Sequence, residues 1–274
     1  NPGEEVIVVE PCYVSYAPTV ALAGGVPVSC PTYQRHGFRL DFDELQALIT
    51  PRTKALIVNY PNNPTGATLR RPDLERLATV AADYDLLVLS DEIYAELTYE
   101  GAHVSLGALP GMKERTLLVS GFSKAFAMTG WRIGYLCGPE ELISAMVKIH
   151  QYTILCAPTI SQFAALEALR DASEDTLAMR AEYERRRNFI VNAFNELGLT
   201  TLMPEGAFYA FANIQSTGLS SEEFCTQLLH AQKVAVVPGT TFGACGEGFI
   251  RASYATAFEK LEQAVERVAR FLGK

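Results

Sequence analysis

The stretch Ser120-Gly-Phe-Ser-Lys-Ala-Phe-Ala-Met-Thr-Gly-Trp-Arg-Ile-Gly134 follows an apolar run, 117–119, that is typical of a buried strand. Lys124 and Arg132 are its only charged residues. Apolar neighbours push a lysine toward its neutral, nucleophilic form, which attacks carbonyl carbon and forms a Schiff base. The planar fork of Arg132 suits a phosphate. The pair suggests pyridoxal phosphate, an aldehyde that carries a phosphate. An equally open interpretation is that Lys124 is a surface residue and that Lys124 and Arg132 merely flank a core hairpin.

This stretch closely resembles the cofactor-lysine signature of class I/II aminotransferases, fold-type-I pyridoxal-phosphate enzymes of the aspartate-aminotransferase superfamily. The resemblance extends from the first residues to the last, and it is strongest to bacterial aminotransferases that act on aromatic or other largely neutral amino acids. It implies ping-pong transfer of an amino group between an amino acid and a 2-oxo acid. In that reaction Lys124 would bind the cofactor covalently and, once displaced by the amino acid, move the proton from Cα.

Length and composition are those of a globular enzyme. A chain of 274 residues can form one large core, or a large domain and a small one, and 49% hydrophobic and 20% charged residues are ordinary for a soluble protein. The net charge of -8 argues against a nucleic-acid partner. The only basic run, Arg185–Arg187, is expected on a solvated helix face. No apolar run approaches membrane-spanning length, and no signal peptide is visible.

The six cysteines show no Cys-x-x-Cys pair and no metal-ligand spacing with the four histidines. We therefore expect no metal site, and we expect reduced, mostly buried thiols in a cytoplasmic protein.

The chain begins Asn1-Pro-Gly, without a methionine, and enters an expected buried strand almost at once. Members of the resembled family have a substantial segment before this point, including a strand and a Gly/Ser-rich loop that helps to hold the cofactor phosphate. We therefore expect the sequence to be an N-terminally truncated piece of a longer parent.

Short apolar runs alternate with helical patterns over the first two thirds of the chain, which predicts an α/β fold with a mostly parallel sheet between layers of helices. The expected strands are 6–9, 27–30, 55–59, 86–90, 116–120 and 133–137. One clear helix has Pro72 in its first turn and an apolar stripe of Leu74, Leu77, Ala78 and Ala81. Ligands of such sheets bind beyond the carboxyl ends of the strands.

A long helical region is expected from Pro139, and a helix from about 174 to 197, with Gly198 as its natural stop. Strands at 207–211, 234–237 and 249–254, a helix that begins at Ser220 and a terminal helix would complete a small α+β domain. We place the boundary near residue 170, so that 1–170 form the large cofactor-binding domain and 171–274 the small one.

Three polar residues lie at or just after expected strand ends: Asn63, Asp91 and Lys124. On turn chemistry alone Asn63 belongs to a helix-entry turn, and Asp91 could merely cap the following helix. The resemblance implies that Asn63 binds the ring hydroxyl of the cofactor, next to a cis bond before Pro64. It also implies that Asp91 keeps the pyridine nitrogen protonated and that Tyr94 donates to the ring oxygen. Glu92 is then expected to be structural.

Tyr13 matches the family position whose aromatic ring stacks on the cofactor, although aromatic residues near strand ends are more often plain core. Many relatives have a phosphate-binding hydroxyl three residues before the lysine. Gly121 stands there in this chain, so Ser123 is expected to compensate.

Arg251 lies within an apolar run, where an arginine is costly unless it is paired. The resemblance implies that it binds the α-carboxylate of the substrate, with Asn63 beside it; an internal salt bridge is the alternative. The segment 152–158 contains no second arginine for an acidic side chain, which disfavours dicarboxylic substrates. Phe208 and Tyr209 are either pocket walls or core.

The sequence therefore predicts a pyridoxal-phosphate aminotransferase, and the resemblance implies a homodimer. Three alternatives remain: a C–S β-lyase of the same fold, an effector-binding domain of a transcription regulator, and an inactive fragment.

Overall fold

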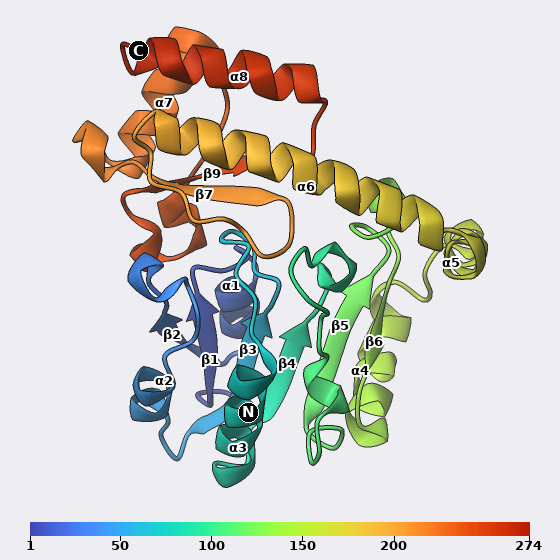
Figure 1. The fold of residues 1–274 in the computed structure, drawn as a ribbon. Coiled ribbons are helices and arrows are strands. Elements are labelled where there is room, and N and C mark those ends of the chain that lie inside the picture. The colour runs from blue at the N-terminus through green and yellow to red at the C-terminus, as the bar shows by residue number, and fades with distance from the viewer.

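The computed structural model describes residues 1–274 and contains two β-sheets with helices packed around them (Figure 1). The larger sheet has the strand order β2-β1-β3-β4-β5-β6, and its first five strands in the chain are parallel. This confirms the predicted α/β class with a mostly parallel sheet. The strands are β1 (Glu5–Glu10), β2 (Val26–Pro31), β3 (Thr53–Asn59), β4 (Leu87–Asp91), β5 (Thr116–Gly121) and β6 (Gly134–Cys137).

Strand β6 runs antiparallel to β5, unlike the other strands of this sheet. The connection 122–133 contains only one short 3-10 turn, Thr129–Trp131, and no crossover helix. A parallel return usually passes through a crossover helix, and without one the chain turns back beside β5. This return places the segment after Lys124 directly beyond the end of the sheet.

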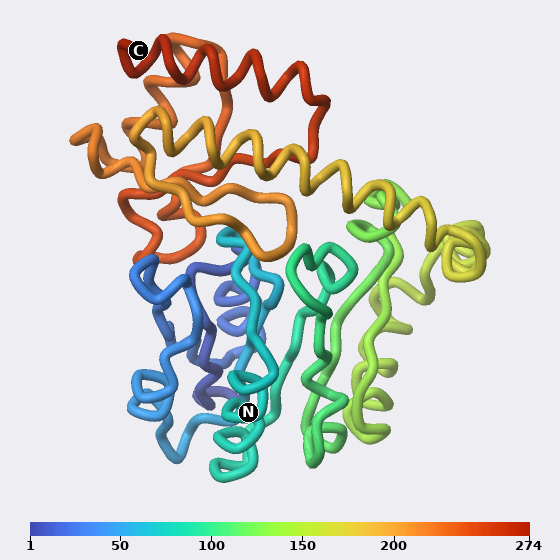
Figure 2. The backbone as a smooth tube through the Cα atoms, viewed as in Figure 1, coloured from blue at the N-terminus to red at the C-terminus, as the bar shows by residue number.

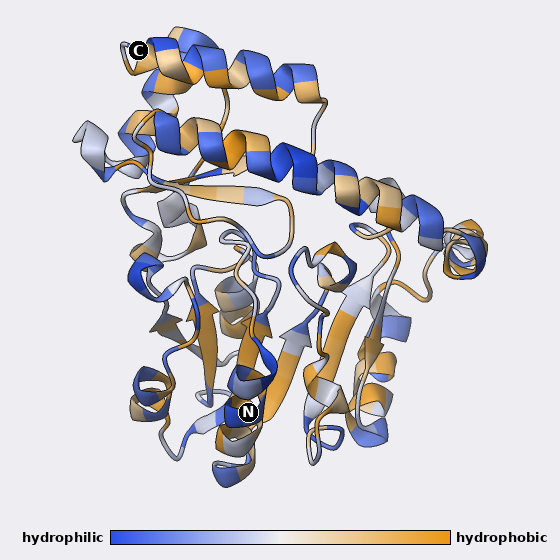
Figure 3. Cartoon of the chain, in the orientation of Figure 1, coloured by the Kyte–Doolittle hydropathy of each residue, from blue (hydrophilic) through white to orange (hydrophobic).

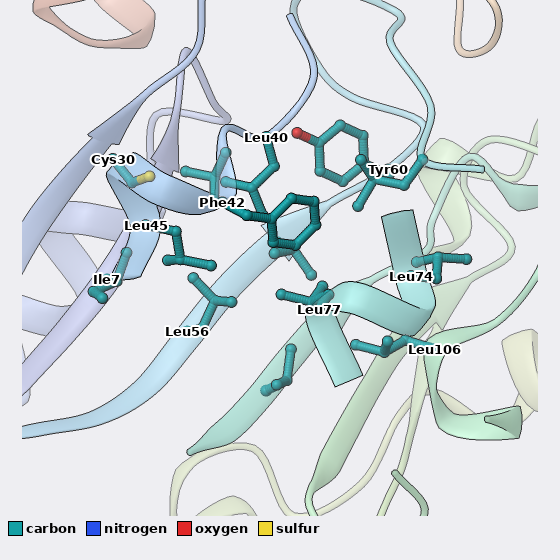
Figure 4. Close-up of a cluster of buried hydrophobic side chains, with 14 of the residues drawn as sticks. Ile7, Cys30, Leu40, Phe42, Leu45, Leu56, Tyr60, Leu74, Leu77 and Leu106 are labelled. Carbon is teal, nitrogen blue, oxygen red and sulfur yellow. The ribbon is translucent and has the colours of Figure 1, made fainter. Parts of the chain in front are cut away.

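Helices α1 (Tyr16–Leu22), α2 (Phe42–Leu48) and α3 (Arg71–Asp83) pack against the parallel strands. The hydropathy colouring shows apolar strands flanked by helices with one apolar side each (Figure 3). Pro72 lies in the first turn of α3, as predicted. Leu74 and Leu77 of α3 join Leu56 of β3 and Leu45 of α2 in the main core cluster (Figure 4). This burial is the main hydrophobic stabilisation of the sheet.

The helical region expected after Pro139 consists of α4 (Glu140–Thr153), α5 (Thr159–Asp171) and α6 (Ser173–Glu196). Helix α6 runs obliquely across the upper part of the molecule in Figure 2, below α8 and beyond the end of the larger sheet. Its C-terminus precedes Gly198, which has φ +77°, as the predicted stop requires. No residue of α4 is buried.

The second sheet contains β7 (Tyr209–Asn213), β8 (Val237–Pro238) and β9 (Phe249–Ser253), antiparallel in the order β7-β9-β8. Helices α7 (Ser221–Gln232) and α8 (Phe258–Phe271) belong to this part of the chain, and Ser220 caps α7 as predicted. The strand predicted at 207–211 begins two residues later, because Ala207 has φ +59°. The strand predicted at 234–237 is reduced to Val237–Pro238, the two residues that pair with Arg251 and Ile250 of β9.

The prediction that Arg185–Arg187 form a solvated helix face is wrong for Arg187. Its side chain is buried, donates to the Pro204 carbonyl oxygen at 2.9 Å and lies over the Tyr99 ring. Consecutive residues on a helix point about 100° apart, so three of them cannot share one face. Arg185 is exposed and pairs with Glu182.

All six cysteines are free thiols. Cys12, Cys30 and Cys225 are buried, whereas Cys137 and Cys156 are exposed, so the prediction of mostly buried thiols holds for only half of them. None of the helices has the length and apolar character that a membrane span requires.

Candidate active site

The eight residues that the sequence predicted for a site line one cavity of about 360 Å³. Its lining residues come from the carboxyl ends of the parallel strands and from β7 and β9 of the second sheet, which lies beyond those strand ends in Figure 1. The structure therefore brings together residues that are up to 238 positions apart in the chain. These residues are Tyr13, Asn63, Asp91, Tyr94, Ser123, Lys124, Arg132 and Arg251.

Two neighbouring strand ends are joined by Asn59, the last residue of β3. Its side-chain amide donates to the backbone oxygen of Asp91 at 2.9 Å, and its side-chain oxygen accepts from the backbone N–H of Asn63 at 3.0 Å. The Asn63–Pro64 peptide bond is cis, as the resemblance implied. Asn59 thus holds the turn that carries Asn63 against the end of β4.

Asp91, the last residue of β4, presents its carboxylate to the cavity. One oxygen accepts from the Tyr16 hydroxyl at 2.6 Å, and the other accepts from the backbone N–H of Ile93 at 3.1 Å. Burial raises the pKa of Asp91, whereas the two hydrogen bonds act in the opposite direction. A partner with positive charge would stabilise the ionised form further.

Lys124 follows β5 and is half-buried, with no hydrogen bond or ion pair to its ammonium group. The Nζ atom lies 5.6 Å from the centre of the Phe208 ring and 5.9 Å from that of Tyr94. Burial lowers the pKa of Lys124, and the charges of Arg251 and Arg132 lower it too, against the effects of Tyr13 and Asp91. The amine is therefore shifted toward its nucleophilic form.

Arg251 reaches the cavity from β9 of the second sheet. It donates to the side-chain oxygen of Asn63 at 2.8 Å and lies over the rings of Tyr209 and Phe242, 4.4 and 4.6 Å from their centres. None of the ion pairs of the protein includes Arg251, so the alternative of an internal salt bridge is wrong. Its buried Nε atom has no hydrogen-bond partner. Such a guanidinium has free capacity for an anion.

The Tyr94 hydroxyl lies 3.0 Å from the Tyr209 hydroxyl, and the rings meet edge to face. Burial raises the pKa of Tyr94, and so does Tyr209. Tyr209 is thus a cavity wall, which the sequence left open. Tyr13 is 44% exposed, so the alternative that it is plain core is wrong.

Ser123, Thr129 and Arg132 are neighbours in the lining of the cavity. The Thr129 hydroxyl donates to the Ser123 carbonyl oxygen at 2.8 Å, and Arg132 donates to the Thr129 carbonyl oxygen at 3.0 Å. Gly121 pairs with Gly134 where β5 and β6 approach closely, and a Cβ atom at Gly121 would lie 2.8 Å from the Gly134 Cα atom. This packing leaves no room at position 121 for a hydroxyl side chain.

Sequence reasoning missed three polar residues that line the cavity: Tyr16, Asn59 and Thr129. Tyr16 is three residues after Tyr13, and Asn59 is a polar residue at the end of an apolar strand. Both signals were present, but only the fold shows that these side chains meet Asp91.

A family model, aminotransferase class I and II, matches residues 1–268. An aromatic-amino-acid aminotransferase from Thermococcus litoralis is 52% identical over 273 residues, which cover 98% of this chain and 70% of the relative. An aspartate aminotransferase from Pyrococcus abyssi is 51% identical over 273 residues, with the same shares covered. The crystal structure of an aromatic aminotransferase from Pyrococcus horikoshii has a TM-score of 0.98 and 50% identity, and the match covers 100% of this chain and 74% of that one.

Proposed function

The chain belongs to the aminotransferase class I and II family of pyridoxal-phosphate enzymes, and from this premise we propose the roles of its residues, its substrate preference and its assembly. It is an aminotransferase that acts on an amino acid and a 2-oxo acid. Pyridoxal phosphate, when bound, supplies an aldehyde that reacts with amines and a ring that acts as an electron sink.

The donor set of the cavity fits this cofactor. An amine without a partner on Lys124 matches the aldehyde, and the carboxylate of Asp91 matches a protonated ring nitrogen. Ser123 and Arg132, neighbours in the lining of the cavity, would hold the phosphate, with Thr129 between them. Asn63 and Tyr94 would bind the ring oxygen, and Tyr13 would cover the ring.

We assign the transfer of the substrate Cα proton to the Nζ atom of Lys124. The lowered pKa of Lys124 supports this role, because a general base works best when its pKa is near the operating pH. The main observation that supports the proposed function is that an amine, a carboxylate and an amide from three strand ends line a single cavity.

The test of this assignment is borohydride reduction of the holoenzyme, followed by peptide mapping. We expect the cofactor label on Lys124. A label on any other lysine would remove the basis of the assignment.

Arg251 would bind the α-carboxylate of the substrate, with Asn63 holding it in place. The unpartnered Nε atom and the lack of a carboxylate partner support this role. Because Arg251 comes from the second sheet, the proposal also implies that the site lies between domains 1–170 and 171–274.

We propose a preference for aromatic or other neutral amino donors. The aromatic walls Tyr13 and Tyr209 and the absence of arginine from 152–158 support it. Relatives of similar identity are named for aromatic amino acids and for aspartate, so both donors must be compared.

The comparison uses the holoenzyme with tyrosine, phenylalanine and aspartate against 2-oxoglutarate. The expected result is a higher kcat/KM for the aromatic donors; a tenfold preference for aspartate would contradict it. Release of pyruvate and thiol from cysteine conjugates would instead indicate a C–S lyase.

We further propose a homodimer in the cytoplasm. Large apolar side chains are exposed on α4, on α5 and on the segment between them, which is typical of a protein interface. Six free thiols support a reducing compartment. The apolar residues are Ile149, Tyr152, Ile154, Leu155, Ile160 and Phe163.

A further inference from the structure

Glu92, the neighbour of Asp91, points to the opposite face of the sheet. The backbone N–H of Glu92 donates to the Val119 carbonyl oxygen at 2.8 Å, so the pairing with β5 continues one residue past β4. Side chains alternate between the two faces of a strand. Asp91 accordingly lines the candidate active site, whereas Glu92 lines a separate cavity of about 400 Å³ with His103.

Glu92 is only 4% exposed, and its carboxylate has four hydrogen-bond partners. One oxygen accepts from the Ser90 hydroxyl at 2.9 Å, the Ser105 hydroxyl at 3.1 Å and the Leu106 backbone N–H at 3.2 Å. The other oxygen lies 2.7 Å from the His103 Nε2 atom. Hydrogen bonds to a buried, charged acceptor are among the stronger ones in proteins. Glu92 therefore ties the end of β4 to the segment 103–106.

One planar peptide joins Asp91 to Glu92, so an anchor on one side chain restricts the other. On the site face, Tyr16 and Asn59 hold Asp91. On the far face, Glu92 and its four hydrogen-bond partners hold the same peptide. A strand end that is bonded on both faces cannot rotate about its own axis without breaking buried hydrogen bonds.

We propose that Glu92 is a positioning residue, which fixes the Asp91 carboxylate in the active site from the far face of the sheet. It does not touch the site itself. This inference rests on the role proposed above for Asp91, the partner of the cofactor ring nitrogen.

The test compares three variants of the holoenzyme: Glu92→Ala, Asp91→Asn and Thr98→Val. Thr98 is a matched control, because it is buried in the same far-face cavity, donates to the Ala95 carbonyl oxygen at 2.9 Å and has no hydrogen bond to Glu92. We would measure the cofactor dissociation constant, the pH dependence of the bound cofactor's absorption and the melting temperature.

We expect Glu92→Ala to weaken cofactor binding on the order of tenfold and to change the absorption profile in the same direction as Asp91→Asn. Thr98→Val should lower the melting temperature and leave the profile unchanged. If Glu92→Ala does not fold, Glu92→Gln, which keeps the volume and one acceptor oxygen, should change the profile in that direction by a smaller amount. A folded Glu92 variant with the wild-type profile overturns the inference.

The double variant Asp91→Asn/Glu92→Ala supplies the second criterion. If Glu92 acts through Asp91, the double variant binds the cofactor no more weakly than Asp91→Asn alone. Additive losses would mean that Glu92 acts independently, and would overturn the inference while leaving the role of Asp91 intact. If Asp91→Asn alone leaves binding and absorption unchanged, the role proposed for Asp91 fails, and the inference fails with it.

Discussion

Burial and hydrogen bonding shift the pKa of Asp91 in opposite directions. The low-polarity surroundings favour the neutral acid, and the Tyr16 hydroxyl at 2.6 Å favours the carboxylate. The balance raises the pKa of Asp91 in the protein without a ligand. A cationic ring nitrogen beside the carboxylate would shift the balance back, so cofactor binding and ionisation of Asp91 are linked.

Tyr16→Phe removes the opposing hydrogen bond, and we expect the pKa of Asp91 to rise further. If Asp91 has the role proposed above, cofactor affinity should fall as the pH drops through this pKa, and in the variant it should fall at a higher pH. A hydrogen bond to a charged group contributes about 1.5 kcal/mol, which corresponds to roughly tenfold weaker binding in the affected pH range. Absorbance titrations over a pH series would measure this.

Tyr84→Phe is the matched control, because Tyr84 is an exposed tyrosine outside the cavity. Superimposable pH profiles of Tyr16→Phe and the wild type would mean that the phenol does not stabilise the charged carboxylate.

Burial in the folded protein disfavours the charged form of Lys124. Its pKa is lowered by burial first, so the folded protein without cofactor binds this proton less well than the unfolded chain does. Below the lowered pKa both states are protonated and the full penalty is present. As the pH rises toward 10.5, the unfolded chain binds more protons and the wild type gains stability.

Lys124→Met should therefore stabilise the cofactor-free protein at pH 7, and the gain over the wild type should shrink as the pH rises toward 10.5. Because Lys124 is half-buried, solvent screening keeps the effect small. Urea unfolding of both proteins at pH 7 and pH 9.5 measures the two differences. A gain that grows with pH would contradict the assigned direction of the pKa.

At the scale of elements, the segment that carries Lys124 depends on the contact between β5 and β6. Gly121 and Gly134 face each other in that pair, and the backbones approach too closely for a side chain. A short antiparallel return with a small residue on each strand turns the chain directly after β5, and Lys124 stands in that turn.

Gly121→Ala should destabilise the protein by about 1–3 kcal/mol, because its Cβ atom would lie 2.8 Å from the Gly134 Cα atom and 3.1 Å from the Ile133 carbonyl oxygen. Both neighbours are backbone atoms, which cannot move without moving the adjoining chain. Gly107→Ala is the control: its nearest contacts would be 3.7 Å or longer. Its effect should stay within about 0.5 kcal/mol. Equal urea midpoints for the two variants would refute the close-approach argument.

At the scale of the whole molecule, two sheets of different architecture meet at one cavity. The parallel sheet supplies the amine, the carboxylate and the amide, and the antiparallel sheet supplies the guanidinium. The apolar side chains on α4 and α5 lie on the outer surface, away from this cavity. Such a surface is stable in water when it is covered, which the proposed homodimer would provide.

Ile160→Asp tests the assembly. Ile160 is 71% exposed, and a carboxylate at that position would be buried without a partner in a dimer. We expect the dimer dissociation constant to rise on the order of 100-fold, measured by size-exclusion chromatography with light scattering. Leu229→Asp, on α7 and outside the α4–α5 surface, should leave the assembly unchanged. A dimer of unchanged strength in Ile160→Asp would place the interface elsewhere.

The sequence by itself determined the α/β class, the positions of most strands and eight of the residues that line the cavity. Apolar runs and turn residues are local signals, and so are the short motifs of the family resemblance, such as the stretch that contains Lys124 and Arg132. Strand ends alone placed Asn63, Asp91 and Lys124 on one edge of the sheet.

Only the tertiary structure decided the direction of β6, the burial of Arg187 and the partners of the polar groups. Tyr16 meets Asp91 across 75 residues, and Asn63 meets Arg251 across 188. Asp91 and Glu92 lie on opposite faces of the sheet because they are consecutive residues in the pairing with β5. These contacts join segments that are far apart in the chain, so no local sequence pattern marks them. The packing of the two sheets brings the segments into hydrogen-bonding distance.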